Sequence, residues 1–338
     1  MSAHVQTPLT TALGDGIIQI RLPMEGNPLR HINGYLIEDD DGLSLIDCGW
    51  KADDVLAALH AGLAEAGYTL GALRRLFITH FHFDHYGLAG TLLRAGVPEL
   101  LMHEIDWAFA REHLIDPVAM DATADAWIAR NGLTVDASLE EEMHHHRIEL
   151  AQPTRFIADG ERVGRLTAIA TPGHSPGHLC YLDARSGKMF TGDHVLDPVT
   201  PHVGVWRDGR GDPLGEYTRS LVKVAEIDAR GVLPAHGEPF PDLRARVAAL
   251  QAHQAEREAH ILIALRAHPS TPASATDIAR ALPWTRREKK LTDLTETHQQ
   301  FAVAETLAHL EHLRARGVVT RDLAADPIVY RLSPEEKS

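Results

Sequence analysis

The stretch ITHFHFDHYG, residues 78–87, sets three histidines and one aspartate within six positions, directly after an apolar run. Alternate side chains of a strand point to the same side, so His80 and His82 at the end of a predicted strand can face one ion together. Asp84 and His85 follow the turn and can face a second ion. Imidazole nitrogens and carboxylate oxygens are ligands of zinc. The stretch therefore predicts a metal site where a strand passes into a helix.

Three later ligand-type residues also stand at the ends of predicted strands. His174 lies in TPGHSPGH, Asp193 in FTGDH and His236 in LPAHGEP. A lone histidine is most often an ordinary core or surface residue. The whole set in this order, each member at a strand end, instead indicates that distant parts of the chain complete the metal site.

The first 240 residues alternate short apolar runs with segments of helical periodicity, which is typical of an α/β fold. Helices are predicted over 51–67 and 88–96. Strands are predicted over 16–22, 33–38, 42–49, 73–80, 99–103, 165–173, 179–183, 188–193 and 231–237.

Two later regions depart from this alternation. Residues 104–150 read as three helical pieces, and a segment of that length between strands is either a lid or an additional packing layer. From Pro241 the chain reads as a long amphipathic helix, further helical segments and a two-stranded hairpin within 318–332. This order is typical of a small winged-helix-like module.

The charge of the chain bears on its partners. The net charge is −14, but residues 251–338 hold 12 Lys and Arg against 12 Asp and Glu, so the whole deficit lies in residues 1–250. An acidic surface repels polyanions, which favours a small-molecule substrate over nucleic acid.

Cysteine usage and hydropathy bear on location. Two isolated cysteines suggest a reducing compartment. No apolar run approaches the ~20 residues of a membrane span, and the N-terminus lacks the pattern of a signal peptide. We therefore expect a cytoplasmic protein without membrane attachment.

These motifs, with HxHxDH as the most specific, resemble the metallo-β-lactamase superfamily over roughly residues 14–240. The resemblance implies an αββα sandwich with a dinuclear metal site at one edge. By position it implies a first ion held by His80, His82 and His174, a second held by Asp84, His85 and His236, and a bridging Asp193.

The resemblance extends to a branch and to a domain division. An aspartate at the position of Asp193 is typical of the glyoxalase II and lactonase branches, whereas the zinc β-lactamases have a cysteine at this position. Asp47 in LIDCG matches the family's early aspartate and is expected to hold a ligand histidine by its free N–H. Residues 1–240 would form the catalytic domain, with 104–150 as a helical insertion, and residues 241–338 the winged-helix-like C-terminal domain.

The implied function is a hydrolase with two Zn²⁺ per chain, although iron and manganese accept the same ligands. A metal-bridging hydroxide would attack a small ester, thioester or lactone, and Asp84 would act catalytically by orienting the nucleophile and carrying its proton. Three alternatives stay open. They are a metal-dependent ribonuclease, favoured by the basic tract WTRREKKL at 284–291, a non-enzymatic winged-helix protein that binds nucleic acid, and redox chemistry at iron.

Two further expectations concern the surroundings of the site. The insertion carries Trp107, Phe109, Leu114 and Trp127, which would shape a mobile apolar lid, or else pack on the sandwich or on the second subunit of a homodimer. His178 and His194 stand beside ligand positions and would support them or touch substrate. Tyr217 would reach the cavity if the lactonase resemblance extends to it.

Overall fold

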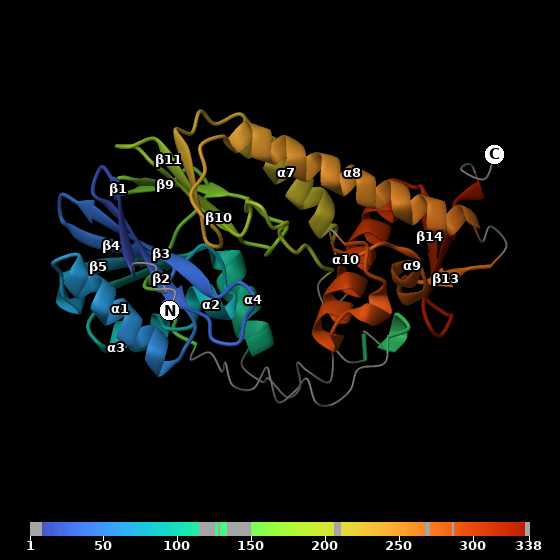
Figure 1. Cartoon of the computed structure of the whole chain (residues 1–338), viewed down its shortest axis with the longest axis horizontal. Coiled ribbons are helices and arrows are strands. Elements are labelled where there is room, and N and C mark those ends of the chain that lie inside the picture. Colours follow the sequence, from blue (N-terminus) through green and yellow to red (C-terminus); the bar gives the residue numbers. More distant parts are fainter. Residues whose placement is uncertain are drawn as a thin grey trace, which may run out of the picture.

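The computed structural model describes residues 9–114, 126–127, 129–133, 150–205, 211–267, 271–285 and 287–334. Two β-sheets face each other, with helices on both outer faces, and a smaller helical lobe lies beside them (Figure 1). The αββα sandwich expected from the sequence is therefore present.

The first sheet has seven strands in the order β1-β2-β3-β4-β5-β6-β7. Neighbours from β1 to β4 are antiparallel, and those from β4 to β7 are parallel. The carboxyl ends of β4, β5 and β6 therefore meet at one edge. The strands are β1 (Thr10–Gly14), β2 (Ile17–Pro23), β3 (His31–Asp39), β4 (Gly42–Ile46), β5 (Leu73–Phe77), β6 (Glu99–Met102) and β7 (Arg155–Phe156).

The second sheet has five strands in the order β12-β11-β10-β9-β8. β11 and β12 are parallel and the other neighbours are antiparallel, so β9, β11 and β12 all end at the same edge. The strands are β8 (Arg162–Val163), β9 (Leu166–Ala170), β10 (Leu179–Asp183), β11 (Lys188–Gly192) and β12 (Gly231–Pro234).

Three apolar layers hold the sandwich together. One lies between the sheets and includes Ile37, Phe77 and Phe190. Another lies between the first sheet and its outer helices, and a third between the second sheet and its own. The helices are α1 (Asp53–Glu65), η1 (Leu70–Ala72), α2 (Phe83–Tyr86), α3 (Ala89–Arg94), α4 (Glu104–Leu114), α7 (Pro213–Ala225) and α8 (Leu243–Ala267).

Helix α1 shows how the sequence produces this packing. Val55, Leu59 and Leu63 recur every four residues, so they lie on one face of the helix, and all three are buried. On the same face, a Cβ on Gly62 would come 2.7 Å from Ile20 of β2, so glycine lets the helix approach the sheet closely.

The C-terminal lobe has an apolar core of its own. The hairpin predicted within 318–332 forms as an antiparallel pair, and one of the segments between the long helices is a single 3₁₀ turn over Leu291–Asp293. The elements are β13 (Ala273–Ser274), α9 (Ala275–Ala281), η2 (Leu291–Asp293), α10 (Glu296–Ala315), β14 (Val319–Asp322) and β15 (Val329–Leu332). The winged-helix assignment and the boundary at 240/241 remain predictions.

Helix α8 belongs to both lobes (Figure 1). Its first half places Leu243 and Val247 in the layer beside the second sheet, and its second half places Ile261 and Leu265 in the C-terminal core. Helix α10 also packs against α7. The lobes therefore share continuous packing.

The expectation of a lid over 104–150 is wrong for its first helix. In α4, Trp107 is only 9% exposed and lies in the core with Ala110, and Phe109 packs against the same core. Trp127 instead packs against the C-terminal core. Residues 115–125, 128 and 134–149, and the side chain of Leu114, lie outside the described residues.

Several observed elements were not predicted, among them β1, β7, β8, β13, η1 and α7. A signal for α7 was present, because Asp212 caps its N-terminus by accepting from Gly215 N–H and Pro213 follows at the first position. Among the described residues no helix is both long and apolar enough to cross a membrane.

Candidate metal centre

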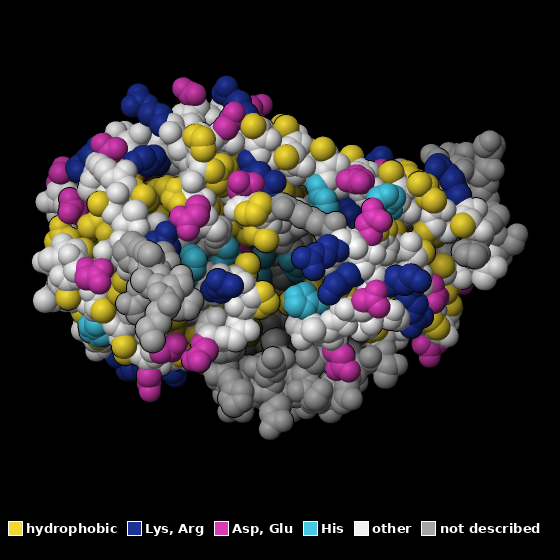
Figure 2. All heavy atoms as spheres, in the orientation of Figure 1, with side chains coloured by type: hydrophobic (Ala, Val, Ile, Leu, Met, Phe, Trp, Pro, Cys, Tyr) yellow, Lys and Arg dark blue, Asp and Glu magenta, His cyan; other side chains and the backbone are white. Residues whose placement is uncertain are grey.

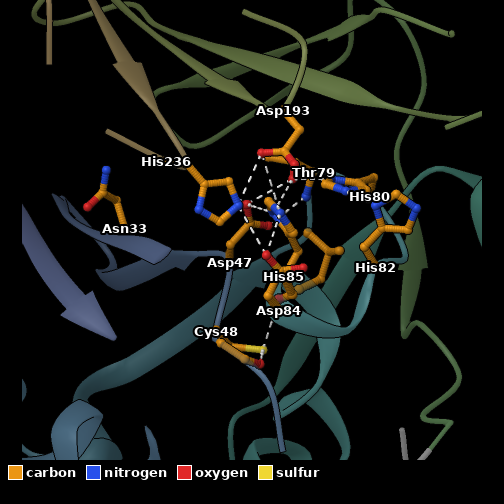
Figure 3. Close-up of polar contacts among 12 residues, drawn as sticks. Asn33, Asp47, Cys48, Thr79, His80, His82, Asp84, His85, Asp193 and His236 are labelled. Carbon is orange, nitrogen blue, oxygen red and sulfur yellow. Dashed lines mark hydrogen bonds and ion pairs between the residues drawn. The ribbon is translucent and has the colours of Figure 1, made fainter. Parts of the chain in front are cut away.

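The seven residues singled out from the sequence come together at the edge where the strands of both sheets end. His80 and His82 follow β5, and Asp84 and His85 lie on the short helix α2. His174 follows β9, Asp193 follows β11 and His236 follows β12. Figure 3 shows Asp193 and His236 reaching from one side toward the side chains of the 79–85 loop on the other.

His80, His82 and His174 form a first cluster. Their nitrogens His80 Nε2, His82 Nδ1 and His174 Nε2 lie 2.9, 3.0 and 3.1 Å from one another. Lone pairs on three such nitrogens repel one another unless a cation or protons lie between them. An ion at the usual Zn–N distance of about 2.0–2.1 Å can touch all three, so the cluster fits a metal ion.

Asp84, His85 and His236 form a second cluster. Asp84 Oδ2 lies 3.1 Å from His236 Nε2 and 3.6 Å from His85 Nε2. His85 Nε2 is buried and has no hydrogen-bond partner in the described part of the chain. A buried nitrogen of this kind is costly unless it meets a ligand, so this cluster also fits a metal ion.

Asp193 lies between the clusters and offers one oxygen to each. Oδ2 lies 3.5 Å from His174 Nε2 in the first cluster. Oδ1 lies 3.6 Å from His85 Nε2 and 3.5 Å from His236 Nε2 in the second, and has no hydrogen-bond partner among the described residues. This is the arrangement that a carboxylate bridging two ions requires.

The outer nitrogens of four histidines are held by hydrogen bonds, which turn the inner nitrogens toward the centre. His85 Nδ1 donates to Asp47 Oδ2 at 2.7 Å, as the sequence predicts. His174 Nδ1 donates to the carbonyl of His202 at 2.7 Å. The remaining two bonds are His236 Nδ1 to the His31 carbonyl at 3.2 Å and His80 Nδ1 to Thr79 Oγ1 at 3.1 Å.

Asp47 adopts an uncommon backbone conformation where it accepts the hydrogen bond from His85. Its φ is +53°, in the left-handed region that aspartate tolerates better than most residues. Its carboxylate also accepts from the N–H and the hydroxyl of Thr79, at 2.9 and 2.8 Å. Asp47 therefore ties the end of β4 to the loop that carries the HxHxDH motif.

The electrostatics of the two clusters differ. Burial and neighbouring histidines lower the pKa of His80 well below its ordinary value, and burial lowers the pKa of His82 to about 3. Burial also acts on His85 and His236, but the nearby carboxylates outweigh it and raise their pKa. The first cluster therefore presents neutral imidazoles, while the second is arranged to hold positive charge.

The two aspartates are held ionised. Burial alone would raise the pKa of Asp84, but His85 and His236 outweigh it and lower the pKa to about 2. The pKa of Asp193 is lowered well below its usual range against burial, because His236 and His85 lie beside it. The carboxylates of the second cluster are thus ionised beside histidines that favour the protonated form, and a divalent cation can take the place of those protons.

The neighbouring histidines divide between two roles. His178 Nε2 accepts from the backbone N–H of Asp193 at 3.2 Å, while its Nδ1 donates to Thr171 Oγ1 at 2.8 Å. It therefore supports Asp193 through the main chain. His194 is fully buried, with its ring 5.1 Å from that of Tyr217, so it does not face substrate.

The expectation for Tyr217 is wrong. Its side chain is fully buried in the layer beneath the second sheet, and its hydroxyl donates to the His194 carbonyl at 3.1 Å. A Cβ on Gly173 would lie 2.5 Å from Tyr217 Cα, so the backbone of α7 presses against the loop before His174. Tyr217 supports this loop and does not line a cavity.

Sequence reasoning missed two tyrosines that join the sheets beneath the centre. Tyr35 of the first sheet donates to the Pro234 carbonyl of the second at 2.7 Å, two residues before His236. Tyr181 of the second sheet donates to the Ile78 carbonyl of the first at 2.8 Å, two residues before His80. A tyrosine of each sheet thus holds the backbone just before a ligand of the opposite sheet. No local sequence pattern predicts these two contacts.

Comparisons with known proteins agree with this geometry. A family model described as the metallo-beta-lactamase superfamily matches residues 27–236. The probable metallo-hydrolase YqjP of Bacillus subtilis is 24% identical over 330 residues, which cover 94% of this chain and 98% of YqjP. Atrochrysone carboxyl ACP thioesterase AacuM of Aspergillus aculeatus is 30% identical over 194 residues, which cover 57% of this chain and 47% of AacuM.

Among solved structures, the metallo-beta-lactamase family protein TTHA1429 of Thermus thermophilus superposes with a TM-score of 0.79. It is 29% identical, and the match covers 95% of this chain and all of TTHA1429. The similarity therefore includes the C-terminal lobe as well as the sandwich. Since the family model covers more than half of the chain, this protein belongs to the metallo-β-lactamase superfamily.

Proposed function

We propose that the protein is a hydrolase that uses two divalent metal ions, one at each cluster. The observation that carries the proposal is Asp193, which directs one oxygen to His174 and the other to His85 and His236. The proposed ligands are His80, His82, His174 and Asp193 for one ion, and Asp84, His85, His236 and Asp193 for the other. Zinc is the proposed metal, although iron and manganese suit the same donors.

The two ions, when bound, supply an activated water whose pKa falls toward about 7 and a positive charge beside the developing oxyanion. Asp84 is placed to move the proton. Its side chain is 18% exposed, so it can reach the open side of the centre, and its low pKa keeps it ionised at neutral pH. It can therefore accept a proton from the attacking water and deliver it to the leaving group.

We propose a thioester as the preferred substrate within the wider class of small esters, thioesters and lactones. The related AacuM is named as an atrochrysone carboxyl ACP thioesterase. A thiolate leaves more readily than an alkoxide, so cleavage of a thioester depends less on proton delivery to the leaving group. One carboxylate is sufficient for that proton transfer.

The C-terminal lobe supplies a candidate wall for the acyl group. Figure 2 shows histidines within the hollow between the lobes. His202, whose carbonyl holds His174, lies with its ring 5.0 Å from that of Phe301 on α10. Phe301 is 51% exposed, so a planar or apolar acyl group can lie against it near the first cluster.

A ribonuclease is the second candidate. The observation that favours it is a set of exposed cations in the C-terminal lobe, Arg287, Lys289 and Lys290. Phosphate groups attract such cations, and binding of this kind weakens steeply with salt. The acidic balance of residues 1–250 opposes it.

The experiment is a metal analysis joined to a substrate panel. Purified protein loaded with zinc is expected to bind two ions and to cleave an aryl or acyl thioester faster than a lactone or a phosphodiester. Fewer than two tightly bound ions would overturn the dinuclear proposal. Phosphodiester cleavage with a steep salt dependence of RNA binding would favour the ribonuclease, and RNA binding without any turnover would favour the non-enzymatic alternative.

A further inference from the structure

Asp106 is a fully buried carboxylate beside the metal centre that is none of the seven proposed ligands. It lies in the first turn of α4. Its Oδ2 accepts from the Phe81 N–H at 3.0 Å and from Ser175 Oγ at 2.8 Å. Its Oδ1 accepts from the Gly177 N–H at 2.5 Å.

The three partners flank the ligands of the first cluster. Phe81 stands between His80 and His82 in the loop after β5, on the first sheet. Ser175 follows His174 in the loop after β9, on the second sheet. One carboxylate therefore joins the two loops that must hold three ring nitrogens about 3 Å apart.

The close approach is built into the backbone. A Cβ on Gly177 would lie 2.6 Å from Asp106 N and 3.0 Å from both Asp106 Oδ1 and His103 Nδ1, so only glycine fits there. Burial raises the pKa of Asp106 to about 7, while the Ser175 hydroxyl and the two backbone N–H groups act in the opposite direction. The carboxylate is thus held by neutral donors whose positions the fold fixes.

An amide cannot replace this carboxylate. Asparagine offers one oxygen and one NH₂ group. If its oxygen faces Gly177, its NH₂ group faces the Phe81 N–H, and if it is turned over, the NH₂ group faces the Gly177 N–H. In either orientation two donors meet. In the first the His80–His82 loop loses its link to α4, and in the second the His174 loop keeps only the bond from Ser175 Oγ.

We propose that Asp106 is a positioning residue for the first metal site, setting the spacing between the His80–His82 loop and the His174 loop. The inference rests on the proposed dinuclear site and adds a division within it. Among the described residues, no ligand of the second cluster donates to Asp106, and its donors Phe81 and Ser175 stand next to first-cluster ligands. The effect of Asp106 therefore falls on one ion and not on the other.

The test measures zinc affinity by competition with a chromophoric chelator, in two backgrounds that separate the sites. In His236→Ala protein, only the first cluster stays complete, and Asp106→Asn is expected to weaken zinc binding by about 10–100-fold. In His82→Ala protein, only the second cluster stays complete, and Asp106→Asn is expected to leave its zinc affinity unchanged. A purely structural role would weaken binding in both backgrounds.

A matched control is Asp183→Asn. Asp183 is also fully buried, accepts from Arg165 and Ser186, and lies at the opposite edge of the sandwich. It is expected to lower the thermal midpoint of the metal-free protein without changing zinc affinity at either cluster. If Asp106→Asn does not fold, Ser175→Ala removes one bond to the same carboxylate and is expected to shift affinity in the same direction by a smaller factor.

Equal zinc affinities with and without Asp106→Asn in the His236→Ala background would overturn the inference, as would equal losses in both backgrounds. Failure of the otherwise unaltered protein to bind two ions is a different result. It would overturn the proposed dinuclear site itself, because that measurement does not involve Asp106.

Discussion

The first and second clusters sit side by side yet hold cations by different means. The first presents three neutral imidazoles, and its loops are fixed from outside through backbone groups. The second presents an ionised carboxylate beside two histidines that favour positive charge. From this comparison we expect geometry to govern zinc affinity at the first cluster and charge to govern it at the second.

The largest effect is expected from the residue that the clusters share. Asp193→Ala removes one oxygen from each proposed site, so both ions should bind weakly and kcat/KM should fall by about 10³-fold or more, which is about 4 kcal/mol. Metal content after dialysis and steady-state kinetics measure this, with Asp183→Ala as the control for loss of a buried carboxylate. Loss of one ion alone would break the assignment of Asp193 as the bridge.

Asp84→Asn sharpens the comparison by removing charge from the second cluster only. We expect kcat to fall by about 10²-fold, or about 3 kcal/mol, because the proton carrier is lost. The first cluster should keep its ion, which a metal count can establish. Near-full activity with both metals bound would remove the proposed role of Asp84.

The pH dependence of metal binding should also separate the clusters. The pKa of His85 and His236 is raised, so near neutral pH a cation at the second cluster must displace protons, and its affinity rises with pH. The pKa of His80 and His82 is lowered, so the first cluster stays deprotonated to lower pH. Between about pH 8 and pH 6, zinc affinity should fall more in His82→Ala protein than in His236→Ala protein. Equal slopes would contradict the difference in charge.

The smallest effect is expected at Phe301, the candidate wall for the acyl group near the first cluster. Phe301→Ala should raise KM for an aromatic acyl thioester by roughly 3–10-fold and leave kcat nearly unchanged, since an aromatic contact contributes about 0.5–1.5 kcal/mol. Leu323→Ala is the matched control, because Leu323 is also 51% exposed in the C-terminal lobe. An equal change in both variants would remove α10 from the substrate site.

Local patterns predicted much of the molecule, and their failures have physical reasons. The helix predicted over 51–67 and the hairpin predicted within 318–332 are stabilised mainly by residues close to one another in the sequence, and both are present in the structure. Trp107 was assigned to a lid because apolar residues in an insertion need a surface, but the periodicity did not say which surface. The structure buries Trp107 in the core beside the first sheet, and Trp127 packs on the other lobe.

By itself the sequence determined which side chains stand near the strand ends, because the apolar run that predicts a strand is a local pattern and the ligand follows within a few residues of its end. The set from His80 to His236 could be named on that basis. Only the tertiary structure decided what aligns them. Asp106, Tyr35 and Tyr181 act on backbone groups of distant segments, at separations of 25 residues or more, and bonds to main-chain atoms leave no mark in the identity of the partner residue.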